Sequence, residues 1–149
     1  MICIYKLTFN YNLVELNNEW DKFNETDTDI VFNLDAESFF DYEKDDKYIC
    51  YLIVELSEIN KYIYILRKYN IDFKQSDISQ SILEGKYVDD LIRYVNFENT
   101  LKYDFFIEDI NNWLSENLNI DIILDKISSS GINSLNEIEK QFLKNIEND

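Results

Sequence analysis

The sequence lacks histidine and proline altogether and has only two glycines, Gly85 and Gly131, in 149 residues. The missing histidine removes the side chain that most often acts as an acid–base group near neutral pH and that most often binds metal ions. Two isolated glycines cannot form a glycine-rich loop around a phosphate. We therefore expect no cofactor, and these absences favour a non-enzymatic protein over a catalyst.

Cysteine is also scarce, because Cys3 and Cys50 are too few for a disulfide-stabilised scaffold. The first six residues, MICIYK, have neither the basic start nor the long apolar stretch of a secretory signal. The longest apolar run, residues 48–54, is too short to span a bilayer. Together these features predict a protein of the reducing cytoplasm with no membrane segment.

Basic residues are strongly outnumbered. Lys and Arg total 14 whereas Asp and Glu total 30, which makes the net charge −16. The acidic residues are spread over both halves of the chain, so the average conceals no basic region. A surface of this sign repels nucleic-acid phosphates and anionic lipid headgroups and attracts basic proteins. We expect a basic protein as partner and no direct binding to nucleic acid or membrane.

The hydrophobic content of 46% is enough for a folded core, and the length is that of a single domain. Apolar runs and alternation predict four strands, at residues 2–9, 30–34, 48–56 and 71–74. Helical spacing of apolar residues predicts helices that start after Asn12 and at Ser57, the latter as the N-cap. Residues 25–29 are expected as a loop, and residues 35–41 as one helical turn.

The resulting order, βαββαβ, predicts a ferredoxin-like sheet over residues 2–75 in an α+β protein. The third strand is apolar on both faces, which is typical of a central strand. Cys3 and Cys50 then lie on neighbouring strands. Their sulfurs can approach each other there, although we interpret both as small buried hydrophobes, because no basic group accompanies them to activate a thiolate.

The rest of the chain reads as helix. Apolar spacing predicts helices at residues 78–83, 88–95, 106–114, 120–127 and 134–146. Gly85 and Gly131 stop two of these helices, and Ser134 with Glu137 matches the capping box that opens the last one. We divide the chain into an α+β domain of residues 1–117 and a helical hairpin tail of residues 118–149 packed on it.

Residues 120–145 read IDIILDKISSSGINSLNEIEKQFLKN. This segment resembles the short C-terminal tail of rhomboid-family membrane proteins of Bacteroidetes, which have the pattern ILDKIS…G…SL…E…FL. The matching positions are Ile123, Leu124, Asp125, Lys126, Ile127, Ser128, Gly131, Ser134, Leu135, Glu139, Phe142 and Leu143. The resemblance implies a Bacteroidetes source but no protease activity, because the chain has no serine–histidine pair and no membrane spans.

Acidic and aromatic side chains are the candidates for a binding site. A partner-binding surface combines carboxylates that steer a basic protein with tyrosines that anchor it. The residues that we assign to it are Asp41, Glu43, Asp45, Asp46, Tyr64, Asp89 and Asp90. Two other interpretations of the acids stay open: a cation site at Asp27, Asp29, Asp35 and Glu37, for which a solvated loop is the simpler reading, and paired carboxylates for glycoside hydrolysis.

Three functions from different classes follow. The first, which we favour, is an acidic protein-interaction module, either an immunity-like inhibitor of a basic toxin or a mimic of nucleic acid. The second is a domain that self-associates through its tail helices. The third is an enzyme that uses carboxylates with a divalent metal, for which no nucleophile–base motif is present. Bulk composition leaves the oligomeric state and the identity of a partner open.

Overall fold

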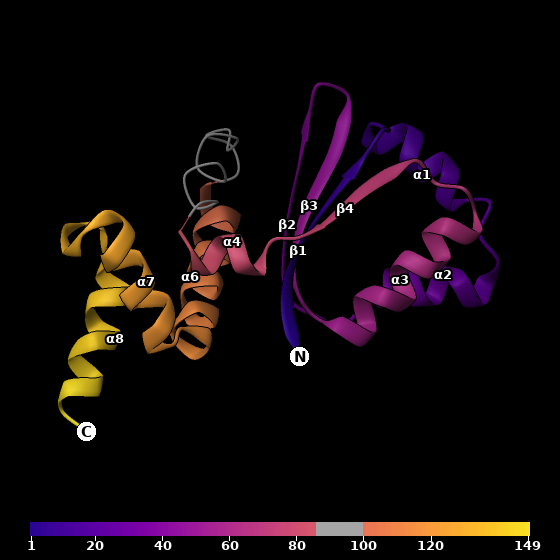
Figure 1. The fold of residues 1–149 in the computed structure, drawn as a ribbon. Helices are drawn as coiled ribbons and strands as arrows, with labels where there is room; N and C mark the ends of the chain where they lie inside the picture. Colours follow the sequence, from indigo (N-terminus) through magenta and orange to yellow (C-terminus); the bar gives the residue numbers. More distant parts are fainter. Residues whose placement is uncertain (86–99) are drawn as a thin grey trace. The chain divides into compact units, whose positions relative to one another are not determined.

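The computed structural model describes residues 1–85 and 100–149. Contacts divide the chain into two compact units, Met1–Ser79 and Gln80–Asp149 (Figure 1). The helix expected at residues 88–95 lies outside the described residues. The division into a domain of residues 1–117 and a packed tail of residues 118–149 stays a prediction. Each unit is described separately below.

The first unit is built on a four-stranded antiparallel sheet of β1 (Ile2–Phe9), β2 (Ala36–Lys44), β3 (Lys47–Glu55) and β4 (Phe73–Asp77). The strand order is β2-β3-β1-β4, and all three neighbouring pairs are antiparallel. This is the ferredoxin-like arrangement, so the α+β prediction and the central position of β3 are confirmed. Five consecutive residues of β3, from Cys50 to Val54, are buried, as expected of a central strand.

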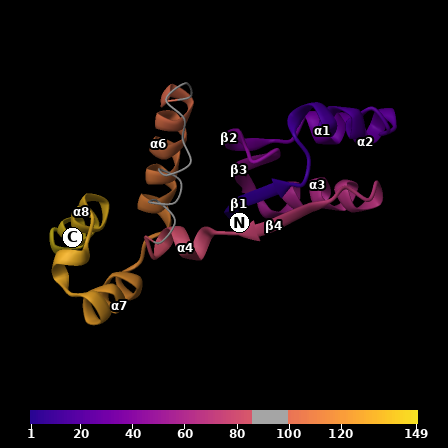
Figure 2. The same cartoon turned by 90° about the horizontal axis from the view of Figure 1, so that it is seen from above.

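Three helices, α1 (Leu13–Trp20), α2 (Glu25–Phe32) and α3 (Leu56–Lys68), lie on one side of this sheet (Figures 1 and 2). The core between them combines side chains from alternate positions of β1 and β3 with the apolar stripe of α3, including Ile59, Tyr62, Ile63 and Leu66. The helix start expected after Asn12 is confirmed, and a capping box forms there, because Asn12 and Glu15 each accept from the other's backbone N–H. Asn70 ends the α3 segment in a left-handed conformation (φ 55°).

The segment between α1 and β2 differs from the prediction. Residues 25–32 form α2 rather than a loop followed by a strand. The Asn24 side chain accepts from the backbone N–H of Asp27 at 2.8 Å, and acids occupy the first turn, where they stabilise a helix N-terminus. The alternation of Ile30 with Phe32 was misleading, because both side chains are exposed on α2.

Two further local predictions are wrong. Residues 36–44 form β2 instead of a helical turn, because hydrogen bonding to β3 supplies an edge pairing that local propensity cannot reveal. Ser57 is not an N-cap, because α3 begins directly at Leu56 after β3 and has no side-chain cap. The strand expected at residues 71–74 starts two residues later, at Phe73.

The second unit is helical over its described residues. It contains most of the short α4 (Ser79–Leu83), together with α6 (Thr100–Asn117), α7 (Ile120–Ser130), the 3-10 turn η2 (Ile132–Ser134) and α8 (Glu137–Glu147). The buried side chains include Phe106, Ile110 and Leu114 of α6, Ile123 of α7 and Leu135. Within residues 1–85 and 100–149, no helix combines the length and apolarity needed to cross a membrane.

The turn between α7 and α8 confirms one cap and corrects another. Gly131 follows α7 with a φ of 81°, which a residue with a side chain rarely adopts, so it is the predicted helix stop. The capping box of α8, however, uses Asn136 with Glu139 and not Ser134 with Glu137. Ser134 belongs to η2, and its hydroxyl donates to the Gly131 carbonyl at 2.6 Å.

Candidate interaction site

The β2–β3 hairpin carries four of the predicted site residues. Lys44 pairs with Lys47, so Asp45 and Asp46 are the only two residues of the turn. Both have left-handed backbones, with φ of 54° and 57°, which is the geometry of a tight hairpin turn that usually contains glycine. Aspartate tolerates this region better than most residues, at a cost that glycine would avoid. The hairpin therefore holds two exposed carboxylates at its tip.

Asp41 and Glu43 lie together on β2, and both face the helices. Asp41 pairs with Cys50 and Glu43 with Tyr48 across the strands, and alternation places these side chains on the helix-covered face of the sheet. The Tyr48 hydroxyl donates to Asp41 at 2.9 Å. Burial, with added repulsion from Cys50 and Asp41, raises the pKa of Tyr48 far above its usual range. Glu43 accepts from the backbone N–H of Leu13, the first residue of α1.

The remaining predicted residues are not gathered at the hairpin. Tyr64 lies on α3, and its side chain is 69% exposed, as an anchor for a partner requires. It lines a shallow cavity together with Asp27, Ser57 and Lys61 rather than with the hairpin acids. Asp89 and Asp90 lie outside the described residues.

An apolar cavity of about 390 Å³ adjoins the hairpin. Its walls come from β1, α1, α2, β2, β3 and α3. They are formed by Leu7, Leu13, Leu16, Asn17, Trp20, Val31, Phe32, Leu34, Ala36, Phe39, Tyr48, Cys50, Leu52 and Tyr62. Two of these residues link the cavity to the acids of β2. The Tyr48 hydroxyl donates a hydrogen bond to Asp41, and the Leu13 backbone N–H donates one to Glu43. Composition and spacing did not indicate this cavity.

Of the four acids considered as cation ligands, Asp27 has a defined structural role. Asp27 Oδ2 accepts from Lys68 Nζ and from the Tyr69 hydroxyl, both at 2.7 Å, and thereby joins α2 to α3. Glu37 falls at a register irregularity of β2. Among residues 1–85 and 100–149, no three acids or cysteines are grouped closely enough to hold a metal ion.

The bond between Asp27 and Lys68 makes stability depend on pH. Hydrogen bonds from Lys68 and then Tyr69 lower the pKa of Asp27 below its unfolded value of 3.8. The contribution is therefore complete above about pH 4 and is lost as the pH falls through the lowered folded pKa. We expect unfolding midpoints measured from pH 6 to about pH 2 to fall less steeply in Asp27→Asn than in the wild type below pH 4. Parallel curves would contradict this role.

The two cysteines lie on neighbouring strands, as predicted, but they are not opposite each other. Cys3 pairs with Val54, and Cys50 pairs with Leu7. Both are free and buried, and burial raises the pKa of each thiol. Protonated, buried thiols are poor nucleophiles, so their surroundings suit packing.

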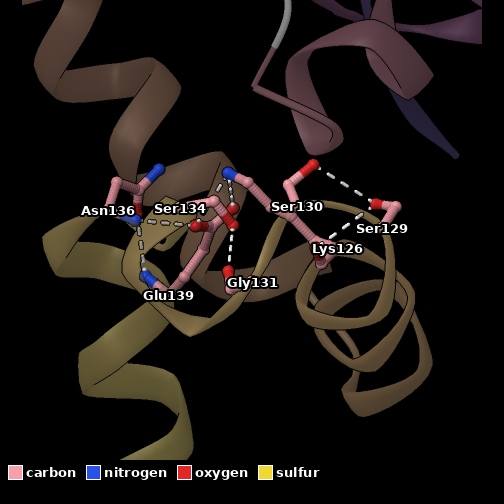
Figure 3. A network of polar contacts seen from close by, with 7 residues as sticks. All are labelled: Lys126, Ser129, Ser130, Gly131, Ser134, Asn136 and Glu139. Carbon is pink, nitrogen blue, oxygen red and sulfur yellow. Dashed lines mark hydrogen bonds and ion pairs between the residues drawn. The ribbon is translucent and has the colours of Figure 1, made fainter.

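The tail contains a buried polar network that explains much of its sequence pattern (Figure 3). Lys126 Nζ of α7 donates to both carboxylate oxygens of Glu139 on α8, at 2.9 and 3.0 Å. The Glu139 side chain is only 3% exposed, and it also accepts from the Asn136 backbone N–H at 2.8 Å. The Lys126–Glu139 pair therefore joins α7 to α8, whereas Gly131 and Ser134 shape the turn between the two helices.

Comparison with protein families gives one match. Residues 114–146 match a model described as a family of unknown function (DUF6576). The match includes the end of α6, all of α7 and most of α8, and thus the whole network around Glu139. No curated protein and no solved structure matches the chain.

Proposed function

We propose that the protein is a non-enzymatic interaction module that binds a basic protein through the β2–β3 hairpin. The observation that carries the proposal is the turn at Asp45 and Asp46, where two exposed carboxylates occupy backbone positions that favour glycine. Left-handed backbone at a residue other than glycine costs free energy, and such residues are often found at functional sites. Asp41 and Glu43 add negative charge next to the turn on β2.

Electrostatics sets what such a hairpin can do. Exposed carboxylates accelerate the encounter with a basic protein but contribute little to residence time, because water and salt screen them. Lys44 and Lys47 flank the turn and offset part of its charge, so the attraction is local to the tip. Tyr64 on α3 is a separate exposed anchor.

The test uses substitutions that neutralise the two carboxylates and keep the conformation of the turn. Asp45→Asn with Asp46→Asn removes two charges, and asparagine also tolerates left-handed backbone. Asp121→Asn with Asp125→Asn makes the same change of net charge on the exposed face of α7. After a basic partner has been identified by cross-linking in the source cells, its association rate with each purified variant is measured at low and high salt. We expect the hairpin variant to associate about three- to tenfold more slowly at low salt, with the α7 variant close to wild type. Equal effects of the two variants would contradict the proposal.

Self-association through the tail is a second candidate. Leu124 of α7, Ile132 of η2 and Ile146 of α8 are exposed apolar side chains in one unit, and exposed apolar groups of this kind are typical of interfaces. If they mediate self-association, Leu124→Glu with Ile132→Glu should reduce the mass measured by light scattering from that of an oligomer to that of a monomer. A monomeric wild type would contradict this candidate.

We also propose that residues 120–145 are related to the tails of Bacteroidetes rhomboid-family proteins. The support is that four positions of the shared pattern, Lys126, Gly131, Ser134 and Glu139, make the polar contacts of the α7–α8 turn. A pattern with this basis specifies a helical hairpin. The cytoplasmic setting is likewise our proposal, and the two buried free thiols fit a reducing compartment.

A further inference from the structure

The cavity beside the hairpin reaches from the surface to the core of the first unit. Leu7, Leu16 and Leu52 form its inner wall and are almost fully buried, whereas Leu13, Phe32 and Phe39 are exposed apolar side chains. Its volume of about 390 Å³ lies within the range of roughly 300–1,000 Å³ that is typical of small-molecule sites. An occupant would cover apolar surface that is now in water.

The cavity wall is uncharged in a protein of net charge −16. It contains no Asp, Glu, Lys or Arg, and its polar side-chain groups are those of Asn17, Trp20, Tyr48, Cys50 and Tyr62. Burial raises the pKa values of Tyr48, Cys50 and Tyr62 far above neutrality, so all three stay protonated. Such a wall offers an anion no counter-charge, and Asp41, bonded to Tyr48, would repel it.

One hydroxyl in the wall has no partner. Tyr62 of α3 is only 9% exposed, and its hydroxyl forms no hydrogen bond with any residue in the described part of the chain. The Tyr48 hydroxyl, in contrast, is committed to Asp41. The Tyr62 hydroxyl is within reach of water in the cavity, and the carbonyl or ether oxygen of a ligand can take the place of that water as its hydrogen-bond acceptor. Tyr62 therefore provides one hydroxyl donor in a cavity whose wall is mostly apolar.

We propose that this cavity binds one uncharged, largely apolar small molecule that carries a carbonyl or ether oxygen as acceptor for the Tyr62 hydroxyl. Strands and helices wall the cavity on several sides, so an occupant must enter whole from the surface. A peptide strand would need both an entrance and an exit, which favours a small molecule. The inference goes beyond the proposed binding of a basic protein and does not depend on it.

The experiment uses three ligands with the same ring system. The probe is 2-acetylnaphthalene, which has an aromatic body and a carbonyl acceptor. Its comparison molecules are 2-ethylnaphthalene, which lacks the acceptor, and 2-naphthoate, which is an anion. Binding to the full chain is followed by chemical-shift titration of backbone amides. We expect saturable binding of 2-acetylnaphthalene with shifts at the cavity residues, weaker binding of 2-ethylnaphthalene and the weakest binding of 2-naphthoate.

Three variants test the location. Tyr62→Phe removes only the hydroxyl and should lower the affinity for 2-acetylnaphthalene by about three- to tenfold. The affinity for 2-ethylnaphthalene should not change. Leu13→Asp places a charge in the cavity wall and should lower the affinity for both neutral ligands. Val14→Asp, at the neighbouring exposed position of α1 that is not part of the wall, is the matched control and should leave binding unchanged.

Several outcomes would overturn the proposal. These are no saturable binding of 2-acetylnaphthalene, 2-naphthoate binding as tightly as the neutral ketone, or equal effects of Leu13→Asp and Val14→Asp. An unchanged affinity in Tyr62→Phe would overturn the role of the hydroxyl. A dimer that Leu13→Asp dissociates would instead assign the cavity to a second copy of the chain. None of these results depends on a protein partner, so failure here is distinct from failure of the hairpin proposal.

Discussion

Replacing Glu139 with alanine should lower the free energy of unfolding of the Gln80–Asp149 unit by about 3 kcal/mol. The Glu139 carboxylate is almost fully buried and accepts from Lys126 Nζ and from the Asn136 backbone N–H. Its removal leaves the Lys126 ammonium, whose side chain is also largely buried, without its counter-charge. Breaking a buried ion pair on one side costs about 3–5 kcal/mol, and the partial exposure of Lys126 places the effect at the lower end.

Tryptophan fluorescence can follow this unit alone. The chain has two tryptophans, of which Trp20 lies in α1 and Trp113 in α6. In a Trp20→Phe background, urea unfolding monitored by fluorescence reports on Trp113. Glu137→Ala is the matched control, because Glu137 is on the same helix and pairs with Lys140 but is 90% exposed, and exposed pairs contribute about 0–1 kcal/mol. Equal losses for both variants would contradict the role of Glu139.

A double variant separates the charge from the packing. Lys126→Met with Glu139→Leu removes both charges and fills the same space with apolar groups. Such replacements are often neutral or stabilising, because no charge is left buried. We expect the double variant to recover most of the stability lost in Glu139→Ala. A double variant as unstable as Glu139→Ala would show that the Asn136 cap, and not the ion pair, accounts for the loss.

Replacing Phe9 with alanine should destabilise the Met1–Ser79 unit by about 3–5 kcal/mol. Phe9 ends β1 and is fully buried. Its ring contacts those of Trp20, Tyr48 and Phe73 at centroid distances of 5.9, 5.8 and 6.1 Å. The substitution removes the ring that contacts the other three. It leaves a cavity between α1 and the sheet, and the surrounding elements can fill this cavity only in part.

The measurement for Phe9→Ala is urea unfolding in a Trp113→Phe background, with Trp20 as the reporter. Tyr64→Ala is a suitable control, because it truncates another aromatic side chain that is mostly exposed, and such surface changes usually alter stability by less than about 0.5 kcal/mol. A loss in Phe9→Ala no larger than that in Tyr64→Ala would contradict the described core.

Periodicity predicted the parts of the fold whose burial follows a simple repeat. Cys50 to Val54 form a continuous apolar run because β3 is central, and α3 buries a regular stripe. It failed at residues 25–44, where the exposed Ile30 and Phe32 of α2 imitated a strand. There the Asn24 cap and the pairing with β3 decided the structure, and neither leaves a signal in hydrophobic spacing.

The candidate sites also have some features that follow from the sequence and others that only the structure shows. The five consecutive charges of residues 43–47 are recognisable from the sequence as an exposed segment, because consecutive charges are rarely buried. The conformation of the turn at Asp45 and Asp46, which makes those two carboxylates unusual, required the backbone. The cavity was not predictable, because its wall joins residues from Leu7 to Tyr62 that no spacing rule connects.

The sequence by itself determined the class of the protein: an acidic α+β chain without histidine, with four strands, a helical second half and a glycine-stopped tail. These properties follow from composition and from local periodicity, which act over a few residues. Only the tertiary structure decided that Glu139 pairs with Lys126 and that an uncharged cavity with the Tyr62 hydroxyl lies beside the acidic hairpin. The physical reason is that both depend on which distant side chains meet after folding, and burial then sets their charge and their cost.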